Sequence, residues 1–255
     1  MTQVEYHAIV SSDWSECLSP NGPFDPIAFT FPELRTDLEK IFRDYTGNKI
    51  KLGEAVEAIQ KLVPAPLNAQ QMDRYLAEFF ATYRGVPELI EWCLSQGILF
   101  MINSTGTQGY FQRAIAKGLI PPVPVVSAHP MLSFPSETDG DRYALTISEI
   151  DDKPRNTLAV AQRYGIPLTR IVVVGDSGGD GPHFQWGASV GAFLIGSMTK
   201  ASLNGYCESR GIKIDTHFGL RYRPGQHRDV YEEMMFDFAD LKEVIRNALA
   251  KKDSS

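Results

Sequence analysis

The sequence contains few cysteines and no long apolar run. Its 255 residues include three cysteines, Cys17, Cys93 and Cys207, which are too few and too scattered for a disulfide framework or a zinc cluster. No segment approaches the roughly 18 consecutive apolar residues that a membrane-spanning helix needs. The first five residues, MTQVE, lack the basic-then-apolar order of a signal peptide. We therefore expect a cytoplasmic protein that does not associate with membranes.

Basic residues are also in the minority. The chain has 25 Lys and Arg residues against 31 Asp and Glu residues, a formal net charge of −6. A protein that binds nucleic acid mainly through charge would show the opposite balance, so no nucleic-acid partner is expected. A local pocket can still oppose the overall sign, so the composition is compatible with a small anionic substrate. With 43% apolar residues, a chain of this length can fold around its own core without a disulfide or metal.

Short apolar runs alternate with segments of helical periodicity along most of the chain. Near-continuous apolar strands are typical of a parallel sheet that helices cover on both faces. We expect five such strands: Tyr6–Val10, Ile98–Ile102, Val123–Val126, Ile171–Val174 and Ala192–Ile195. We expect helices at Pro87–Ser95, Pro154–Tyr164 and Phe238–Lys251. This alternation predicts an α/β fold with a doubly wound parallel sheet.

The stretch from about residue 25 to residue 85 has no clear strand. Apolar side chains recur in it at helical spacing, which is typical of helices that pack on a core. We therefore expect a small helical insertion after the first strand. Residues 1–20 and 86–255 would form the α/β core, and residues 21–85 the insertion.

The most informative segment runs from Ile171 to Gly181, where an apolar strand leads into a glycine-rich turn. The turn carries two carboxylates four residues apart, Asp176 and Asp180. Ligands of open α/β sheets bind beyond the carboxyl ends of the strands, and carboxylates there suit a hard cation such as Mg²⁺. The sequence GDSGG also satisfies the G-x-S-x-G elbow of α/β-hydrolases, so a serine esterase that uses Ser177 is an alternative.

Three further segments place polar side chains where predicted strands end or helices begin. Asp13 follows the first strand, residues 104–106 (Ser-Thr-Gly) follow the second, and Lys153 directly precedes a helix-starting proline. Backbone N–H groups at a helix N-terminus bind anions, so residues 104–106 form a candidate anion site. The order of all four segments carries more information than any one of them.

That order resembles the haloacid dehalogenase (HAD) superfamily over residues 5 to 196. It comprises strand–Asp, a helical insertion, strand–Ser, Lys before a helix, and strand–Gly-Asp with a second Asp four residues on. The resemblance implies a HAD-like Rossmannoid core, and the insertion is similar to the small helical C1-type cap of phosphoserine-phosphatase-like members. It further implies a Mg²⁺-dependent hydrolase of the phosphatase type that acts on a small phosphorylated metabolite.

The resemblance also implies roles for the matching residues. Asp13 would be the nucleophile that forms an aspartyl-phosphate, a step that divides a difficult hydrolysis into two easier ones. The implied catalytic residues are Asp13, Ser15, Ser104 and Lys153. The implied substrate-binding residues are Ser104, Thr105, Gly106 and Lys153. The implied metal ligands are Asp13, the carbonyl of Ser15, Asp176 and Asp180.

Motif one departs from the family pattern Asp-x-Asp-Gly-Thr, because it reads Asp-Trp-Ser-Glu-Cys from Asp13 to Cys17. Ser15 replaces the usual acid, and the loss of a general acid costs roughly 100- to 10,000-fold in rate if nothing replaces it. Glu16, His183 or a cap residue could supply the proton. Alternatively, the leaving group needs no proton, as in an acyl phosphate, or the protein binds a phospholigand without turnover.

Two other features leave alternatives open. The Asp-Trp start of motif one is also similar to phosphonoacetaldehyde hydrolase, which cleaves a phosphonate with a cap lysine. Candidates for such a lysine are Lys40, Lys49, Lys51 and Lys61. The basic stretch from Arg221 to Arg228 is either a solvated loop or part of an anionic substrate pocket.

Overall fold

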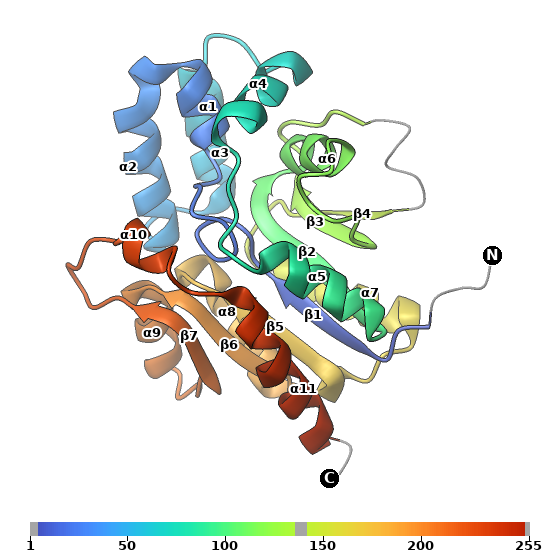
Figure 1. Ribbon diagram of the computed structural model, residues 1–255. Coiled ribbons are helices and arrows are strands. Elements are labelled where there is room, and N and C mark those ends of the chain that lie inside the picture. Colours follow the sequence, from blue (N-terminus) through green and yellow to red (C-terminus); the bar gives the residue numbers. More distant parts are fainter. Residues whose placement is uncertain (1–4, 136–141, 253–255) are drawn as a thin grey trace.

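The computed structural model describes residues 5–135 and 142–252, and these residues contain one seven-stranded sheet (Figure 1). All strands are parallel, in the order β4-β3-β2-β1-β5-β6-β7. They are β1 (Ala8–Ser12), β2 (Ile98–Thr107), β3 (Val125–His129), β4 (Tyr143–Thr146), β5 (Ile171–Gly175), β6 (Phe193–Thr199) and β7 (Thr216–Arg221). The predicted doubly wound α/β fold is confirmed. The direction of winding reverses at β1, so the crevice between β1 and β5 is the expected ligand site.

Helices cover both faces of the sheet. One face packs against α5 (Val86–Ser95), α6 (Gln108–Ala116) and α11 (Leu241–Lys252). The other packs against α7 (Asp152–Tyr164), α8 (Gly181–Ser189) and α9 (Ala201–Glu208). The strand pleat divides neighbouring side chains between these layers: Val172 and Val174 belong to the first, and Ile171 and Val173 to the second. Burial on both faces explains why the central strands are apolar throughout.

The insertion between β1 and β2 consists of helices, as predicted. They are α1 (Asp25–Thr30), α2 (Arg35–Thr46), α3 (Leu52–Leu62) and α4 (Ala69–Phe79), with a 3-10 turn at Pro32–Leu34. They lie over the carboxyl ends of the central strands (Figure 1). Arg113 of α6 makes two hydrogen bonds, of 2.7 and 2.6 Å, with the Asp73 carboxylate of α4. The division into a core (residues 1–20 and 86–255) and a C1-type cap (residues 21–85) stays a prediction.

The sequence did not predict the two edge strands, β4 and β7. The four residues of β4 are alternately half-buried and exposed, and every residue of β7 is half-buried or exposed. Neither strand therefore has the continuous apolar run of a central strand. The remaining elements are α10 (Val230–Glu233) and 3-10 turns at Leu168–Arg170, Gly178–Asp180 and Phe238–Asp240. None of the helices in the described ranges is long and apolar enough to cross a membrane.

One expectation about the second strand was wrong. Residues 104–106 do not lie at a helix N-terminus, because β2 continues to Thr107 and α6 begins only at Gln108. The polar end of β2 is buried, and it remains a strand because its pairing with β3 continues to Thr107, opposite His129. Any ligand contact of residues 104–106 is therefore made from the end of a strand.

Candidate active site

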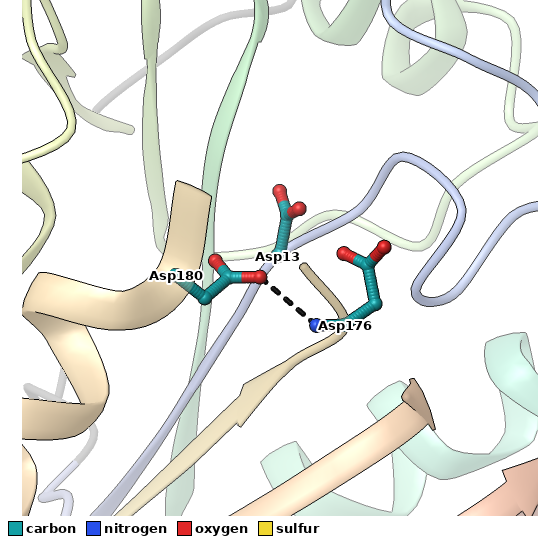
Figure 2. A group of neighbouring side chains, drawn as sticks. All are labelled: Asp13, Asp176 and Asp180. Atoms are coloured by element: carbon teal, nitrogen blue, oxygen red, sulfur yellow. Dashed lines mark hydrogen bonds between the residues drawn. The ribbon is translucent and has the colours of Figure 1, made fainter. Parts of the chain in front are cut away.

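Three carboxylates converge where β1 and β5 end. Asp13 follows β1, and its N–H donates a 3.0 Å hydrogen bond to the Val174 carbonyl of β5. Asp176 follows β5, and Asp180 ends the 3-10 turn beyond it. One oxygen of each carboxylate lies within 4.8 Å of the other two, and all three residues are buried (Figure 2). The structure thus brings together three of the residues predicted to bind metal.

The backbone of the turn after β5 wraps closely around the carboxylate of Asp180. Its Oδ2 accepts hydrogen bonds from the backbone N–H groups of Asp176, at 2.9 Å, and Ser177, at 3.3 Å. A Cβ on Gly175 would lie only 2.6 Å from the Asp180 Cγ, so this position requires glycine. These contacts explain why the strand must lead into a glycine before the two aspartates.

Lys153 neutralises one side of the carboxylate cluster. Its Nζ lies 2.5 Å from Asp180 Oδ1 and 3.3 Å from Asp13 Oδ1, and its side chain is only 2% exposed. Burial opposes both charges, but the attraction dominates: the carboxylates raise the pKa of Lys153, and Lys153 lowers the pKa of Asp180. Both groups are therefore ionised.

A buried amide fixes the start of α7 that carries Lys153. Asn103 of β2 donates hydrogen bonds from Nδ2 to the Lys153 carbonyl, at 2.9 Å, and to Thr157 Oγ1, at 3.0 Å. The same amide bonds Ser11 of β1 at 3.1 Å. The helix begins at Asp152, so Lys153 lies inside its first turn rather than before it. This anchoring holds the ammonium at the end of the central strands.

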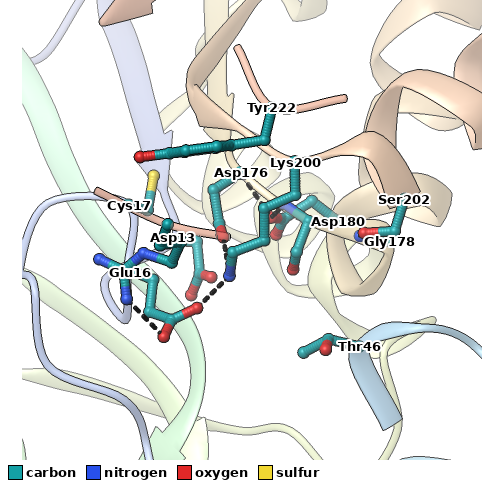
Figure 3. A network of polar contacts seen from close by, with 12 residues as sticks. Asp13, Glu16, Cys17, Thr46, Asp176, Gly178, Asp180, Lys200, Ser202 and Tyr222 are labelled. Atoms are coloured by element: carbon teal, nitrogen blue, oxygen red, sulfur yellow. Dashed lines mark hydrogen bonds and ion pairs between the residues drawn. The ribbon is translucent and has the colours of Figure 1, made fainter. Parts of the chain in front are cut away.

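Lys200 neutralises the opposite side and was not predicted from the sequence. It directly follows β6, and its Nζ lies 2.7 Å from Asp176 Oδ2 and also contacts the Glu16 carboxylate (Figure 3). Burial raises the pKa of Asp176 well above its ordinary value; Lys200 opposes this rise, and the neighbouring Asp180 and Asp13 add to it. The available signal was its position at the end of a strand beside β5.

The predicted substrate-binding residues border the same place. Ser104 is fully buried, and its hydrogen bond to Asp13 lowers the pKa of that carboxyl, while burial, the largest effect, raises it. Thr105 and Ser15 line a small pocket of about 10 Å³ together with Asp13 and Lys153. Gly106 lines a neighbouring pocket that Ser15 also borders.

The insertion closes over this pocket. Tyr45 and Thr46, at the end of α2, line it from above. Asn48 donates a 3.4 Å hydrogen bond to the Gly178 carbonyl, and a Cβ on Gly178 would lie 2.7 Å from the Thr46 carbonyl. Beside the closed pocket lies a cavity of about 780 Å³, and Lys200 lines both. Lys200 therefore stands at the boundary between the carboxylate cluster and the larger space.

Two of the suggested proton donors have other roles in the structure. Burial tends to raise the pKa of Glu16, but Lys200 and Arg228 lower it below its ordinary value, so Glu16 is ionised. His183 bonds the Thr157 hydroxyl at 3.0 Å, and burial together with Lys153 lowers its pKa to about 3. The imidazole is therefore neutral near pH 7, and neither residue offers a proton.

The described part of the chain does not have the geometry that a serine esterase using Ser177, or a phosphonate hydrolase using a cap lysine, would need. No hydrogen bond there joins the Ser177 hydroxyl to a histidine, and His217 instead bonds Thr199. Lys40 and Lys49 pair with Asp44 at the surface, with side chains 72% and 71% exposed. The other two candidate cap lysines are also exposed, and no cap lysine lines the closed pocket.

Solved structures share this architecture. A phospho-aspartyl intermediate analogue of phosphoserine phosphatase superimposes with a TM-score of 0.62 at 14% identity, covering 94% of this chain and 99% of the other. A substrate-bound phosphoserine phosphatase gives 0.60 at 15% identity, covering 91% and 98%. The chain has the HAD-like fold. A HAD-family hydrolase from Salmonella enterica subsp. enterica serovar Typhi gives 0.58 at 14% identity, covering 84% and 68%.

No protein-family model and no curated protein sequence matches the chain. The HAD-like resemblance inferred from the order of the motifs is confirmed at the level of the fold. At identities of 14 to 15%, the chemistry of this chain has to be argued from its own residues.

Proposed function

We propose that this protein is a Mg²⁺-dependent hydrolase of the phosphatase type that acts on a small phosphorylated metabolite through an aspartyl-phosphate at Asp13. The observation that carries the proposal is a cluster of three carboxylates with one lysine at the carboxyl ends of β1 and β5, where the direction of winding reverses. Its members are Asp13, Asp176, Asp180 and Lys153. A carboxylate nucleophile beside fixed positive charge suits phosphoryl transfer, because charge must be stabilised on the transferring oxygens.

The donor set fits a magnesium ion. Within the described residues, the buried Asp176 Oδ1 has neither a hydrogen bond nor an ion pair, and Asp13 Oδ1 has no hydrogen bond and only the 3.3 Å ion pair with Lys153. Buried carboxylate oxygens without a partner are unfavourable, and Mg²⁺ prefers such ligands. Both oxygens of Asp180 are already engaged, so we expect Asp13 and Asp176, with the Ser15 carbonyl, to hold the ion. The bound ion would supply charge neutralisation at the phosphoryl group.

The remaining steps belong to residues of the chain. Asp13 would attack phosphorus and displace the leaving group, and water would then hydrolyse the aspartyl-phosphate to release phosphate. Lys153 would bind a phosphoryl oxygen, and it opposes the rise in the pKa of Asp13 that burial causes. Ser104 and Thr105 approach the same point from the end of β2 and would bind the other oxygens. The walls of the small pocket separate the nucleophile from bulk water.

The leaving group restricts the substrate. Ser15 cannot protonate an alkoxide effectively, and Glu16 and His183 are not poised to do so. We therefore favour substrates whose leaving group needs no proton, such as acyl phosphates, over ordinary phosphate esters. The larger cavity would accept the rest of the molecule. Arg43 and Arg223 line it, and neither forms an ion pair in the described ranges, which favours an anionic substrate.

Turnover assays test this proposal. Purified protein would be incubated with acyl phosphates, phosphomonoesters and phosphonates, with Mg²⁺ or with EDTA. We expect Mg²⁺-dependent phosphate release, fastest with acyl phosphates and absent in Asp13→Asn. Activity that survives both EDTA and the Asp13 substitution would contradict the proposal. Thermal stabilisation by phospholigands without any turnover would favour the non-catalytic binding alternative.

A further inference from the structure

Glu16 occupies a strained position in motif one. It stands where the HAD pattern usually has glycine, and its φ is 58°, in the left-handed region that disfavours residues with a side chain. Its side chain is only 13% exposed. Such strain persists where surrounding contacts hold it, and it often marks a functional position. The contacts of the carboxylate therefore matter.

Two cations hold that carboxylate. Arg228 Nη1 lies 2.6 Å from Glu16 Oε1, and Lys200 contacts Oε2. Arg228 is itself fixed by the fully buried Glu233, at 2.5 Å, which also accepts a 2.8 Å hydrogen bond from Tyr222. Arg228 belongs to the basic stretch of the sequence, so part of that stretch is a structural clamp on motif one.

The clamp places Lys200 on Asp176. The Lys200 backbone N–H donates a 2.7 Å hydrogen bond to the Asp176 carbonyl, and the ammonium lies over the Phe42 ring, 5.6 Å from its centroid. With Nζ 2.7 Å from Asp176 Oδ2, one oxygen of this carboxylate is occupied by a positive charge of the chain (Figure 3). The other oxygen, Oδ1, has no hydrogen-bond partner among the residues described.

A divalent cation bound to Asp176 would lie close to the ammonium group of Lys200. Mg²⁺ lies about 2.1 Å from its ligand oxygens and demands near-octahedral geometry. A second positive charge on the same carboxylate repels the ion and restricts the approach to Oδ2. Lys153, in contrast, pairs mainly with Asp180 and forms no ion pair with Asp176.

We propose that Lys200, held in place by Glu16, competes with the divalent cation for Asp176 and sets a low affinity of the carboxylate cluster for Mg²⁺. This inference rests on the proposed function, because it concerns the same metal site. In this role, Lys200 does not touch the reacting atoms but controls how readily the metal ion binds. The metal would then bind mainly when substrate oxygens complete its coordination.

Direct binding measurements test this role without any substrate. Isothermal titration of Mg²⁺ would be performed on the wild type and on Lys200→Met. We expect Lys200→Met to bind Mg²⁺ about 10- to 100-fold more tightly, the scale on which residues beside metal ligands act. Lys200→Gln is a second neutral variant that can still hydrogen-bond Glu16. Lys200→Arg keeps the charge and should keep the weak affinity.

Two controls separate the possible failures. Lys213→Met removes the same charge from an exposed position outside both pockets and should leave the affinity unchanged. Asp176→Asn should abolish binding. If the neutral Lys200 variants bind Mg²⁺ no more tightly than the wild type, the inference about Lys200 is wrong and the metal site stands. If neither the wild type nor these variants bind Mg²⁺, the metal in the proposed function is wrong as well.

Discussion

The two sides of the carboxylate cluster are built differently. On one side, Lys153 comes from a helix fixed by a buried amide, and its ammonium pairs with Asp180. On the other, Lys200 comes from the end of β6 and is held by Glu16, at a position where motif one departs from that pattern. The comparison shows that two cations held in different ways balance one cluster of carboxylates: a buried amide fixes the helix of Lys153, and an ion pair with Glu16 holds Lys200.

The largest expected effect concerns the nucleophile between the two sides. Asp13→Asn should reduce Mg²⁺-dependent phosphate release on the order of 10⁴-fold or more, because an amide cannot form the aspartyl-phosphate. Steady-state kinetics with an acyl phosphate would measure this loss. Asp73→Asn, a substitution in the ion pair between α4 and α6, is the control and should retain most of the rate. Comparable losses in both variants would mean that folding, not chemistry, was affected.

Removing each lysine should reveal the difference in burial. Lys153→Met should lower the free energy of unfolding by about 3 to 5 kcal/mol, because it leaves buried carboxylates without their cation. Lys200→Met should cost less, about 1 to 2 kcal/mol, because its side chain is 17% exposed rather than 2%. Urea unfolding in EDTA measures both values. Equal losses would remove the proposed asymmetry.

The closed insertion over the Lys200 side can be tested with glycine substitutions. Gly178→Ala should destabilise the protein by about 1 to 3 kcal/mol, because the new methyl group would lie 2.6 Å from Asn48 Nδ2 and 2.7 Å from the Thr46 carbonyl. Gly205→Ala, in α9, is the matched control, because the added carbon would meet no atom within 4 Å apart from its own helical neighbours. It should be neutral or stabilising, since alanine favours a helix. Thermal unfolding that treats both alike would contradict the described packing.

The two aspartates after β5 should respond with opposite signs, and the Asp176 substitution should give the smallest effect. Burial raises the pKa of Asp176; Lys200 opposes this rise, and the neighbouring carboxylates add to it. The resulting loss of stability therefore grows as pH rises above the ordinary Asp pKa and is complete above the raised pKa. For Asp180, burial favours a higher pKa but Lys153 lowers it, so its charge contributes stability that is lost as pH falls through the lowered pKa. Without metal at pH 7, Asp176→Asn should stabilise the protein by about 1 kcal/mol, and Asp180→Asn should destabilise it.

The pH dependence distinguishes these two cases. The gain from Asp176→Asn should shrink as pH falls toward the ordinary Asp pKa of about 4, because the unfolded wild-type chain is then protonated at this carboxyl as well, so folding no longer has to add a proton or bury a charge. Urea unfolding in EDTA at several pH values provides the measurement. A gain that is constant down to that pH would show that the charge of Asp176 is not the cause.

Much of the fold could be predicted from local pattern. The central strands are apolar because both faces are buried, and the helical insertion shows its own periodicity. The edge strands β4 and β7 could not be recognised, because partial exposure removes the apolar run. The polar end of β2 suggested a helix start, whereas pairing with β3 keeps it extended to Thr107, opposite His129.

The sequence by itself determined the order of the motifs along the chain. Because the carboxyl ends of parallel strands come together at one edge of a sheet, that order also predicted that Asp13 and Asp176 meet there. Only the tertiary structure decided which cation faces which carboxylate. Lys200 and Arg228 lie 184 and 212 residues from Glu16 along the chain, a separation at which no local pattern specifies pairing. Their contacts arise because the fold buries all three groups together, where charges must pair.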